Sequence, residues 1–209
     1  MMFYQDAPDN APRFGDILSG FVLAAPSISE LSSFSKYNIE IEHPEYGVIL
    51  SPCCSIGNVL TVSPLIYINA NFFTNPYFKE DLTRLNRKMP PDKTVSQEIW
   101  EKKIDPEEKV RRLAEGETYA FIENFIFEEH RILKKYNVKP KGEAEVQTSY
   151  YMIDFKRQHK INCKNIPSAS NAQTASKILQ LSIGTRAELR DKISFYYSRI
   201  PKEDIVIED

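Results

Sequence analysis

Residues 46–66 constrain the fold more than any other part of the chain. Two short apolar runs in this stretch, Val48–Leu50 and Val59–Val62, are each followed by Ser and Pro. Apolar, β-branched runs bounded by Ser, Pro, Gly and Asn are typical of buried strands. A polar link that contains Cys53 and Cys54 joins the two runs. We therefore predict a hairpin-like pair of strands here.

The segment before this pair carries two further strand patterns. Gly15-Asp16 is typical of a turn and is followed by the apolar continuation Ile17–Ala24. Tyr37–Glu42 alternates Tyr, Ile and Ile with Asn, Glu and Glu, which is the period-two pattern of a half-buried strand. Pro26–Lys36 lies between them, is rich in serine and is predicted to be a loop.

Strand patterns return in the second half of the chain. Tyr119–Phe127 is apolar and aromatic, and we favour a strand there although the periodicity also allows a helix. Arg131–Lys141 is basic and is predicted to be an exposed turn. Val146–Asn162 has bulky residues on both faces, which suits a central strand followed by a second one at His159–Cys163. The predicted β-rich core comprises residues 13–70 and 117–164.

A helical insertion is predicted between these two β-rich parts, over residues 75–115. Its clearest helix start is Asp105, which is followed by Pro106 and two glutamates. This order supplies a cap, a proline at the first helical position and acidic side chains at the positive end of the helix dipole.

A second helix is predicted near the C-terminus, over residues 185–200. Thr185 and Glu188 have the spacing of a capping box, and apolar residues then recur on one helical face. The whole pattern predicts an α+β protein that forms a single elaborated domain over residues 1–209.

The composition narrows the class of protein. Of 209 residues, 42% are hydrophobic and 27% are charged, which is typical of a soluble globular protein. A net charge of −2 argues against a polybasic, histone-like role, because it supplies no global attraction for nucleic acid or anionic lipid. No apolar leader opens the chain, and three cysteines are an odd number. We expect a cytoplasmic protein with free thiols.

Three short landmarks resemble the MazF/PemK-like toxin family. They are Gly15-Asp16-Ile17, Val48-Ile49-Leu50-Ser51-Pro52 and Val62-Ser63-Pro64-Leu65. The resemblance implies a small SH3-like β-barrel as the core of the fold, with the helical insertion and the C-terminal helix added to it. It also places the protein in a bacterial toxin–antitoxin or phage-defence setting.

The chain is also similar to an uncharacterised bacterial and phage group. That group carries a Val-Leu-Ser-x-x-Cys-Asp motif and ends in a helix with spaced Leu-Ser, Arg, Leu, Lys, Tyr and Arg. The matching residues here are Leu181-Ser182, Arg186, Leu189, Lys192, Tyr196 and Arg199. Cys54-Ser55 stands where the group has Cys-Asp, so the carboxylate is missing.

The chain departs from the MazF pattern where ribonuclease chemistry is expected. The family has a basic residue before the Val-Leu-Ser strand and a Ser or Thr after the Val-x-Pro strand, whereas this chain offers Glu45-Tyr46-Gly47 and Leu65-Ile66. Cleavage of RNA needs a base, an acid and stabilisation of phosphate charge. We therefore expect a non-catalytic protein. The alternative is a divergent endoribonuclease that cleaves single-stranded RNA, with candidate residues Asp16, Ser51, Ser63 and Arg13, or Arg84 as the cation.

Partly exposed aromatic side chains favour a protein partner instead. Aromatic residues are enriched at protein interfaces, although the same residues can simply pack an insertion onto its core. The candidate partner-binding residues are Phe72, Phe73, Tyr77, Trp100, Tyr196 and Tyr197. The leading hypothesis is an interaction subunit that binds a co-encoded effector or antitoxin.

Two further sequence features bear on nucleic-acid and metal binding. A local basic segment with Arg131, Lys134, Lys135 and Lys139 could contact nucleic acid, although a charge run on a loop is usually just solvated. The adjacent Cys53 and Cys54 lack the usual Cys-x-x-Cys spacing of a zinc site, so we expect buried thiols and no metal or cofactor.

Overall fold

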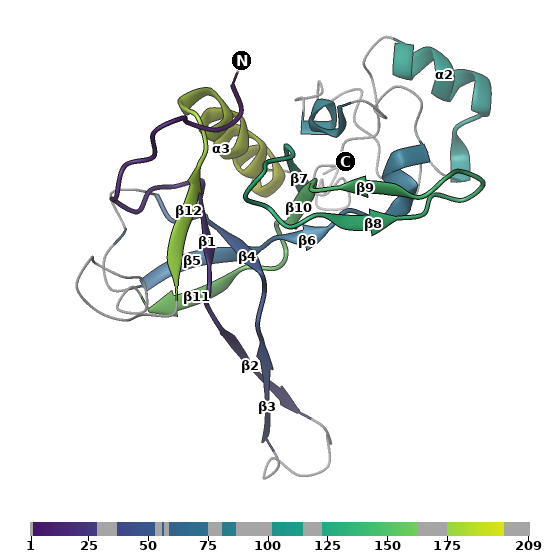
Figure 1. The fold of residues 1–209 in the computed structure, drawn as a ribbon. Helices are drawn as coiled ribbons and strands as arrows, with labels where there is room; N and C mark the ends of the chain where they lie inside the picture. Colours follow the sequence, from purple (N-terminus) through teal and green to yellow (C-terminus); the bar gives the residue numbers. More distant parts are fainter. Residues whose placement is uncertain are drawn as a thin grey trace, which may run out of the picture. The chain divides into compact units, whose positions relative to one another are not determined.

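The computed structural model describes residues 2–28, 37–52, 56, 59–74, 81–86, 102–114, 123–162 and 175–198. It is a mixed α+β protein in which every described strand pair is antiparallel (Figure 1). The chain groups into two compact units, and each is described by itself. Unit 1 comprises Met1–Leu65 and Arg157–Gly184, and unit 2 comprises Ile66–Lys156 and Thr185–Asp209. The single elaborated domain stays a prediction.

Unit 1 is built on a five-stranded sheet with the order β11-β5-β4-β1-β12. The strands are β1 (Asp16–Ser19), β4 (Tyr46–Ile49), β5 (Val59–Pro64), β11 (His159–Asn162) and β12 (Ser176–Gln180). The predicted hairpin-like pair is confirmed, because β4 pairs with β5 and places Val48 opposite Ser63. Strand β12 was not predicted. Within the described residues the sheet is open, and the SH3-like barrel stays a prediction.

Two further strands of unit 1, β2 (Leu23–Ile28) and β3 (Tyr37–Glu42), form a separate two-stranded ribbon. We call this ribbon the arm. It continues from β1 and β4 and extends away from the five-stranded sheet (Figure 1). Tyr37–Glu42 was predicted correctly, but the predicted loop Pro26–Lys36 is wrong at Pro26–Ile28, which belongs to β2. The predicted continuous run Ile17–Ala24 is also wrong, because Gly20 has a φ of 74° and separates β1 from β2.

Unit 2 contains a three-stranded sheet, a hairpin and several short helices. The sheet has the order β6-β10-β7, and the hairpin pairs β8 with β9. The strands are β6 (Ile66–Tyr67), β7 (Asn124–Phe127), β8 (Tyr136–Val138), β9 (Val146–Thr148) and β10 (Tyr151–Asp154). The 3-10 helices are η2 (Ala70–Thr74) and η3 (Leu82–Asn86), and the α-helices are α2 (Pro106–Ala114) and α3 (Ile183–Tyr197), the last of which begins in unit 1.

Several predictions for unit 2 need correction. The predicted turn Arg131–Lys141 contains strand β8, because Tyr136 and Val138 face a core that the charge pattern does not reveal. Of the two strands predicted over residues 146–163, the second, at His159–Cys163, is confirmed over its described residues as β11, whereas the first is divided into β9 and β10. Of the strand predicted at Tyr119–Phe127, the described part contains β7.

The helix predictions have mixed outcomes. The predicted start after Asp105 is confirmed, and the Lys109 amide donates to the Asp105 carbonyl at 2.9 Å. The capping box at Thr185 is wrong, since α3 begins at Ile183 and Thr185 lies buried inside it. Ser182, a residue type favoured at helix caps, directly precedes the helix. None of the described helices combines the length and the apolar composition needed to cross a bilayer.

The core of unit 1 closes tightly around Gly47 in β4. A Cβ atom added at Gly47 would lie 2.5 Å from Cζ of Phe21 and 2.8 Å from Cγ1 of Val62. Both distances are shorter than carbon atoms tolerate, so the neighbours would have to move. Phe21 and Val62 belong to the apolar cluster at the base of the arm, together with Leu18, Leu23 and Ile49.

We expect Gly47→Ala to lower the free energy of unfolding by about 2 kcal/mol, because the added methyl group overpacks this cluster. Chemical denaturation of the variant and the wild type would measure the difference. Gly47→Ala combined with Phe21→Leu should lose less than the sum of the two single changes, because the smaller side chain vacates the overlap. Strict additivity would contradict the proposed clash.

Candidate functional site

Asp16, one of the residues predicted for ribonuclease chemistry, lies at the start of β1. Asp16 is 0% exposed. Its Oδ2 atom lies 2.7 Å from Nζ of Lys177 on the neighbouring strand β12, and it also accepts a hydrogen bond of 2.7 Å from the Arg13 backbone amide. A buried carboxylate requires such partners, because burial of an unpaired charge is very costly.

Lys177 is at the centre of a polar cluster in unit 1. Besides Asp16, its ammonium group contacts Oδ1 of Asp9 at 3.3 Å, the Ala11 carbonyl at 3.0 Å and Oε1 of Gln180 at 3.0 Å. The Asp9 amide donates to the same Gln180 oxygen. This cluster therefore ties the N-terminal segment to β1 and β12, and its geometry is that of a structural clamp. No sequence pattern indicated Lys177 or Gln180, because β12 itself was not predicted.

The clamp also affects Asp9, which lies at its exposed side. Partial desolvation raises the pKa of Asp9, but the hydrogen bond and charge of Lys177 and the nearby charge of Arg13 outweigh this effect and lower it. The Arg13 guanidinium contacts Oδ2 of Asp9 at 2.8 Å. Arg13 thus pairs through its side chain with Asp9, and only its backbone amide binds Asp16.

The two serines predicted for catalysis are buried in the same sheet. Oγ of Ser51 accepts a hydrogen bond of 2.7 Å from the Thr61 amide, just beyond the end of β4. Ser63 is 0% exposed within β5. Arg84, the alternative cation, belongs to unit 2 and pairs with Asp81 at 3.7 Å. Within this predicted set, the backbone amide of Arg13 and the carboxylate of Asp16 are in direct contact.

The predicted aromatic partner site is only partly exposed. Phe73 is buried in the apolar core of unit 2, and Phe72 packs against that core. Tyr77 and Trp100 lie outside the described residues. On α3, Tyr196 is half-buried with its ring 5.6 Å from that of Phe155, while Tyr197 is 60% exposed. Of these two tyrosines, Tyr197 is therefore the more exposed.

The predicted basic segment is solvent-facing but mixed in charge. Arg131, Lys134, Lys135 and Lys139 are all exposed. Glu143 and Glu145 follow this segment, between β8 and β9 of the same hairpin, and add negative charge. The aromatic residue in this segment, Tyr136, does not offer its ring to a base, because it is half-buried and its hydroxyl donates to the Tyr150 carbonyl. Burial raises the pKa of Tyr136 to about 12, with a smaller contribution from Glu129.

Lys192 in unit 2 is one of the residues that match the C-terminal helix of the bacterial and phage group, but its burial was not predicted from the sequence. Lys192 of α3 is 8% exposed, and its Nζ atom donates to the Leu85 carbonyl of η3 at 3.0 Å. The ring of Phe125 lies 6.0 Å from the same atom. Burial lowers the pKa of Lys192 to about 7. This lysine fixes α3 to the core of unit 2, and it lies too deep to serve as a surface charge.

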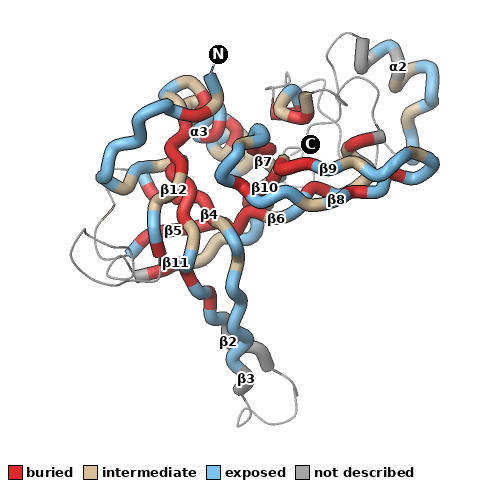
Figure 2. Tube along the Cα trace, viewed as in Figure 1, coloured by how far each residue is buried: buried red, intermediate tan, exposed pale blue. Residues whose placement is uncertain are grey.

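The arm is the most unusual surface in unit 1. Ile39 is 69% exposed and Ile41 is 60% exposed, and both belong to β3 (Figure 2). The register places Ala24, which is also exposed, opposite Ile41, so the described side chains on this face of the ribbon are apolar. At the base of the ribbon, Val22 is also exposed. We call this surface the isoleucine face.

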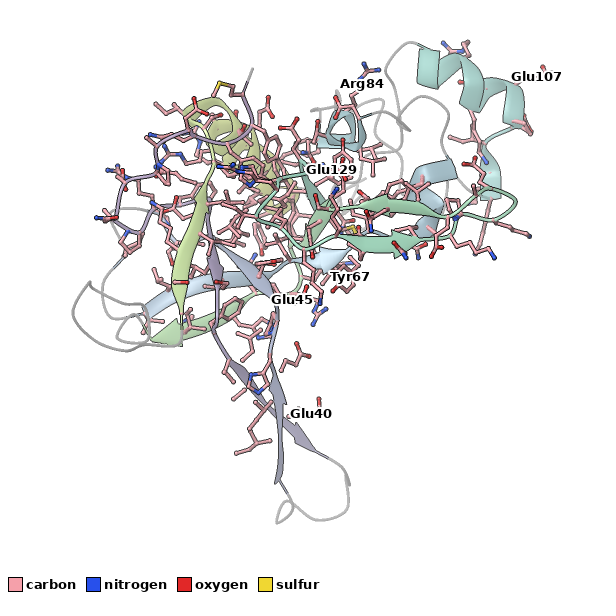
Figure 3. The ribbon with its side chains drawn as sticks, viewed as in Figure 1. Glu40, Glu45, Tyr67, Arg84, Glu107 and Glu129 are labelled. Carbon is pink, nitrogen blue, oxygen red and sulfur yellow. The ribbon has the colours of Figure 1, made fainter. Side chains whose placement is uncertain are left out.

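The opposite face of the arm is acidic and is anchored at its base. Leu23, which pairs with Glu42, is buried in the core of unit 1. Glu42 contacts Nη2 of Arg157 at 3.1 Å. Glu40 lies on the same face and is exposed on the arm (Figure 3). The alternation in Tyr37–Glu42 predicted β3 but not this exposure, since an alternating pattern indicates two faces without showing whether the apolar one is covered.

Comparison of the chain with protein-family models, curated proteins and solved structures found no match. Among the described residues, no group of three or more His, Cys, Asp and Glu side chains is arranged to hold a metal ion.

Proposed function

We propose that this chain is a non-catalytic interaction subunit that binds a protein partner through the isoleucine face of the arm. The observation that carries the proposal is the exposure of Ile39 and Ile41 on one face of the ribbon, with the exposed Ala24 opposite Ile41. Single exposed apolar residues are common, but a contiguous exposed apolar face is typical of an interaction site.

The physical chemistry of a two-stranded ribbon supports this proposal. An isolated ribbon is marginally stable in water, because it cannot bury an apolar face by itself. The base of the arm is anchored through Phe21 and Leu23 in the core of unit 1, whereas Ile39 and Ile41 are exposed to water. Binding of a partner over Ile39 and Ile41 would remove their side chains from water, and burial of one isoleucine contributes about 2 kcal/mol.

The environment of the predicted catalytic residues supports the non-catalytic part of the proposal. Asp16 is neutralised by Lys177, and Ser51 accepts a backbone hydrogen bond. A general base or nucleophile must be able to reach its substrate. These groups are instead buried in contacts that hold the sheet and the N-terminal segment together.

The biological setting of the proposal comes from the sequence landmarks. Those that resemble the MazF/PemK-like family lie at or beside β1, β4 and β5, which are neighbours in the sheet of unit 1. We keep an SH3-like, MazF/PemK-related core as part of the proposal. The partner would then be a co-encoded effector or antitoxin of a toxin–antitoxin or phage-defence system.

Co-expression with the products of the flanking genes tests this function. We expect a complex to co-purify with the wild-type chain, and the double variant Ile39→Thr/Ile41→Thr to weaken it by at least about tenfold in Kd. Threonine retains the β-branched shape that favours a strand, so the arm itself should persist.

Ile183→Thr is the matched control, because Ile183 is 79% exposed but lies at the start of α3. This variant should bind like the wild type. Equal binding by the arm variant, or no complex with any flanking product, would count against the proposed function.

A further inference from the structure

The outer edge of β3 offers a backbone surface for strand pairing. Within the described residues, β3 pairs only with β2, and the ribbon has two strands. An unpaired edge presents rows of N–H and C=O groups that another extended segment can bind. On the other side of the ribbon, Pro26 lacks an N–H group and makes the edge of β2 a poorer template.

The position of Pro26 also indicates which groups of β3 face outward. Residues directly opposite each other in an antiparallel pair alternate between exchanging two hydrogen bonds and exchanging none. Pro26 has no N–H group to donate, so Pro26 and Ile39 form a pair that exchanges no hydrogen bonds. The N–H and C=O groups of Ile39 therefore point away from β2, and by the period of two those of Ile41 do the same.

The side chains of β3 determine what kind of strand fits this edge. Ile39 and Ile41 lie on one face, while Glu40 and Glu42 lie on the other. A strand added beside β3 presents its own alternate residues to the same two faces. Apolar residues would extend the isoleucine face, and Lys or Arg would lie beside the glutamates, where opposite charges are favourable.

A second copy of this chain fits less well than such a strand. Pairing β3 with β3 of another copy brings Glu40 and Glu42 of both copies onto one face. Like charges that face each other across strands are destabilising. The acidic character of the arm therefore favours a basic partner segment over self-association.

We propose that the outer edge of β3 binds an extended partner segment by strand addition, and that this segment alternates apolar residues with Lys or Arg. The proposal rests on the proposed function and specifies how the arm recognises its partner. Specificity comes from the alternation of side chains, and backbone hydrogen bonds to Ile39 and Ile41 supply the pairing.

A synthetic peptide in which Lys and Val alternate tests this proposal with the full chain. We expect fluorescence anisotropy to detect its binding, and a Glu–Val peptide of equal length to bind at least about tenfold more weakly. Glu40→Lys should reverse this preference, because it replaces the exposed acid on the charged face. Equal binding of both peptides to the wild type would overturn the proposed charge selection.

Backbone methylation of the peptide separates strand addition from simple side-chain contact. Two versions carry N-methyl groups, one on the Val amides and the other on the Lys amides. Successive amides of an extended strand point to opposite edges, so only the Val set or only the Lys set can face β3. The version methylated on that set should bind at least about tenfold more weakly, and the other version should bind like the unmodified peptide. Retention by both, or loss by both, would overturn strand addition.

Two further measurements distinguish a failure of strand addition from a failure of the proposed function. Hydrogen exchange of the Ile39 and Ile41 amides should slow when the Lys–Val peptide binds. If Ile39→Thr/Ile41→Thr disrupts the co-expressed complex but the peptide fails to bind, strand addition is wrong and the interaction function stands. Concentration-dependent dimers of the wild-type chain that Glu40→Lys disrupts would favour the second copy and contradict the proposal.

Discussion

Lys192→Met should stabilise the protein at pH 7 and destabilise it at pH 10. The pKa of this lysine is lowered from 10.5 to about 7 by burial, so the folded protein favours the neutral amine. A shift of this size corresponds to about 5 kcal/mol of differential free energy between the two protonation states. Methionine has a similar shape and carries no charge.

The sign of the pH dependence follows from proton counting. Between pH 7 and 10.5 the unfolded chain keeps the Lys192 proton while the folded chain has released it, so stability rises with pH. This contribution is lost progressively as pH falls from 10.5 to about 7; below pH 7 both states hold the proton, and the folded state holds it as a buried charge. Across the window, the wild type should gain about 4 kcal/mol relative to the variant.

The hydrogen bond to Leu85 explains why the variant loses at high pH. Methionine cannot donate to the Leu85 carbonyl, and a buried acceptor without its donor costs about 1–3 kcal/mol. We therefore expect the variant to be about 2 kcal/mol more stable at pH 7 and about 1 kcal/mol less stable at pH 10.

Urea denaturation from pH 6 to pH 10 measures this crossover. Lys135→Met is the matched control, since Lys135 is exposed in the same unit and should show no such change. Parallel pH profiles for the wild type and the Lys192 variant would show that Lys192 does not titrate in this window.

Asp16→Ala should have the second large effect, a loss of about 3 kcal/mol in the free energy of unfolding. The change removes the contact of 2.7 Å to Lys177 and the acceptor of the Arg13 amide. Breaking a buried ion pair by removing one partner costs about 3–5 kcal/mol, because the other charge is left without compensation. The remaining contacts of Lys177 to Asp9, Ala11 and Gln180 place the expected value at the lower end.

A double-mutant cycle isolates the pair. Lys177→Met alone leaves the fully buried Asp16 carboxylate without its cation, so it should also be strongly destabilising. The double variant should be more stable than the sum of the single losses by about 2 kcal/mol. Asp191→Ala is the control: Asp191 pairs with Arg190 on the exposed surface of α3, and its loss should cost less than about 0.5 kcal/mol.

The same variant distinguishes the structural role of Asp16 from the ribonuclease hypothesis. In the structural role, Asp16→Ala changes stability, and the wild-type chain leaves single-stranded RNA intact. If the wild type cleaves RNA and both Asp16→Ala and Ser51→Ala remain folded but inactive, the non-catalytic proposal is wrong. Far-ultraviolet circular dichroism and an RNA cleavage assay provide these two readings.

Local patterns in the sequence determined several elements of this protein by themselves. The alternation of Tyr37–Glu42 defines β3, and the order of Asp105, Pro106 and two glutamates defines the start of α2. The Ser-Pro ends of two apolar runs delimit β4 and β5. These signals succeed because they depend on residues within a few positions, where backbone geometry, capping and turn chemistry act directly.

Only the tertiary structure decided which side chains are covered. Strand β12 brings Lys177 beside Asp16 from far along the chain, and η3 supplies the carbonyl that Lys192 binds. The burial of Phe73 rather than its exposure depends on the same kind of long-range packing. The isoleucine face is the converse case: alternation predicts an apolar face, but whether another layer covers it depends on where the rest of the chain lies.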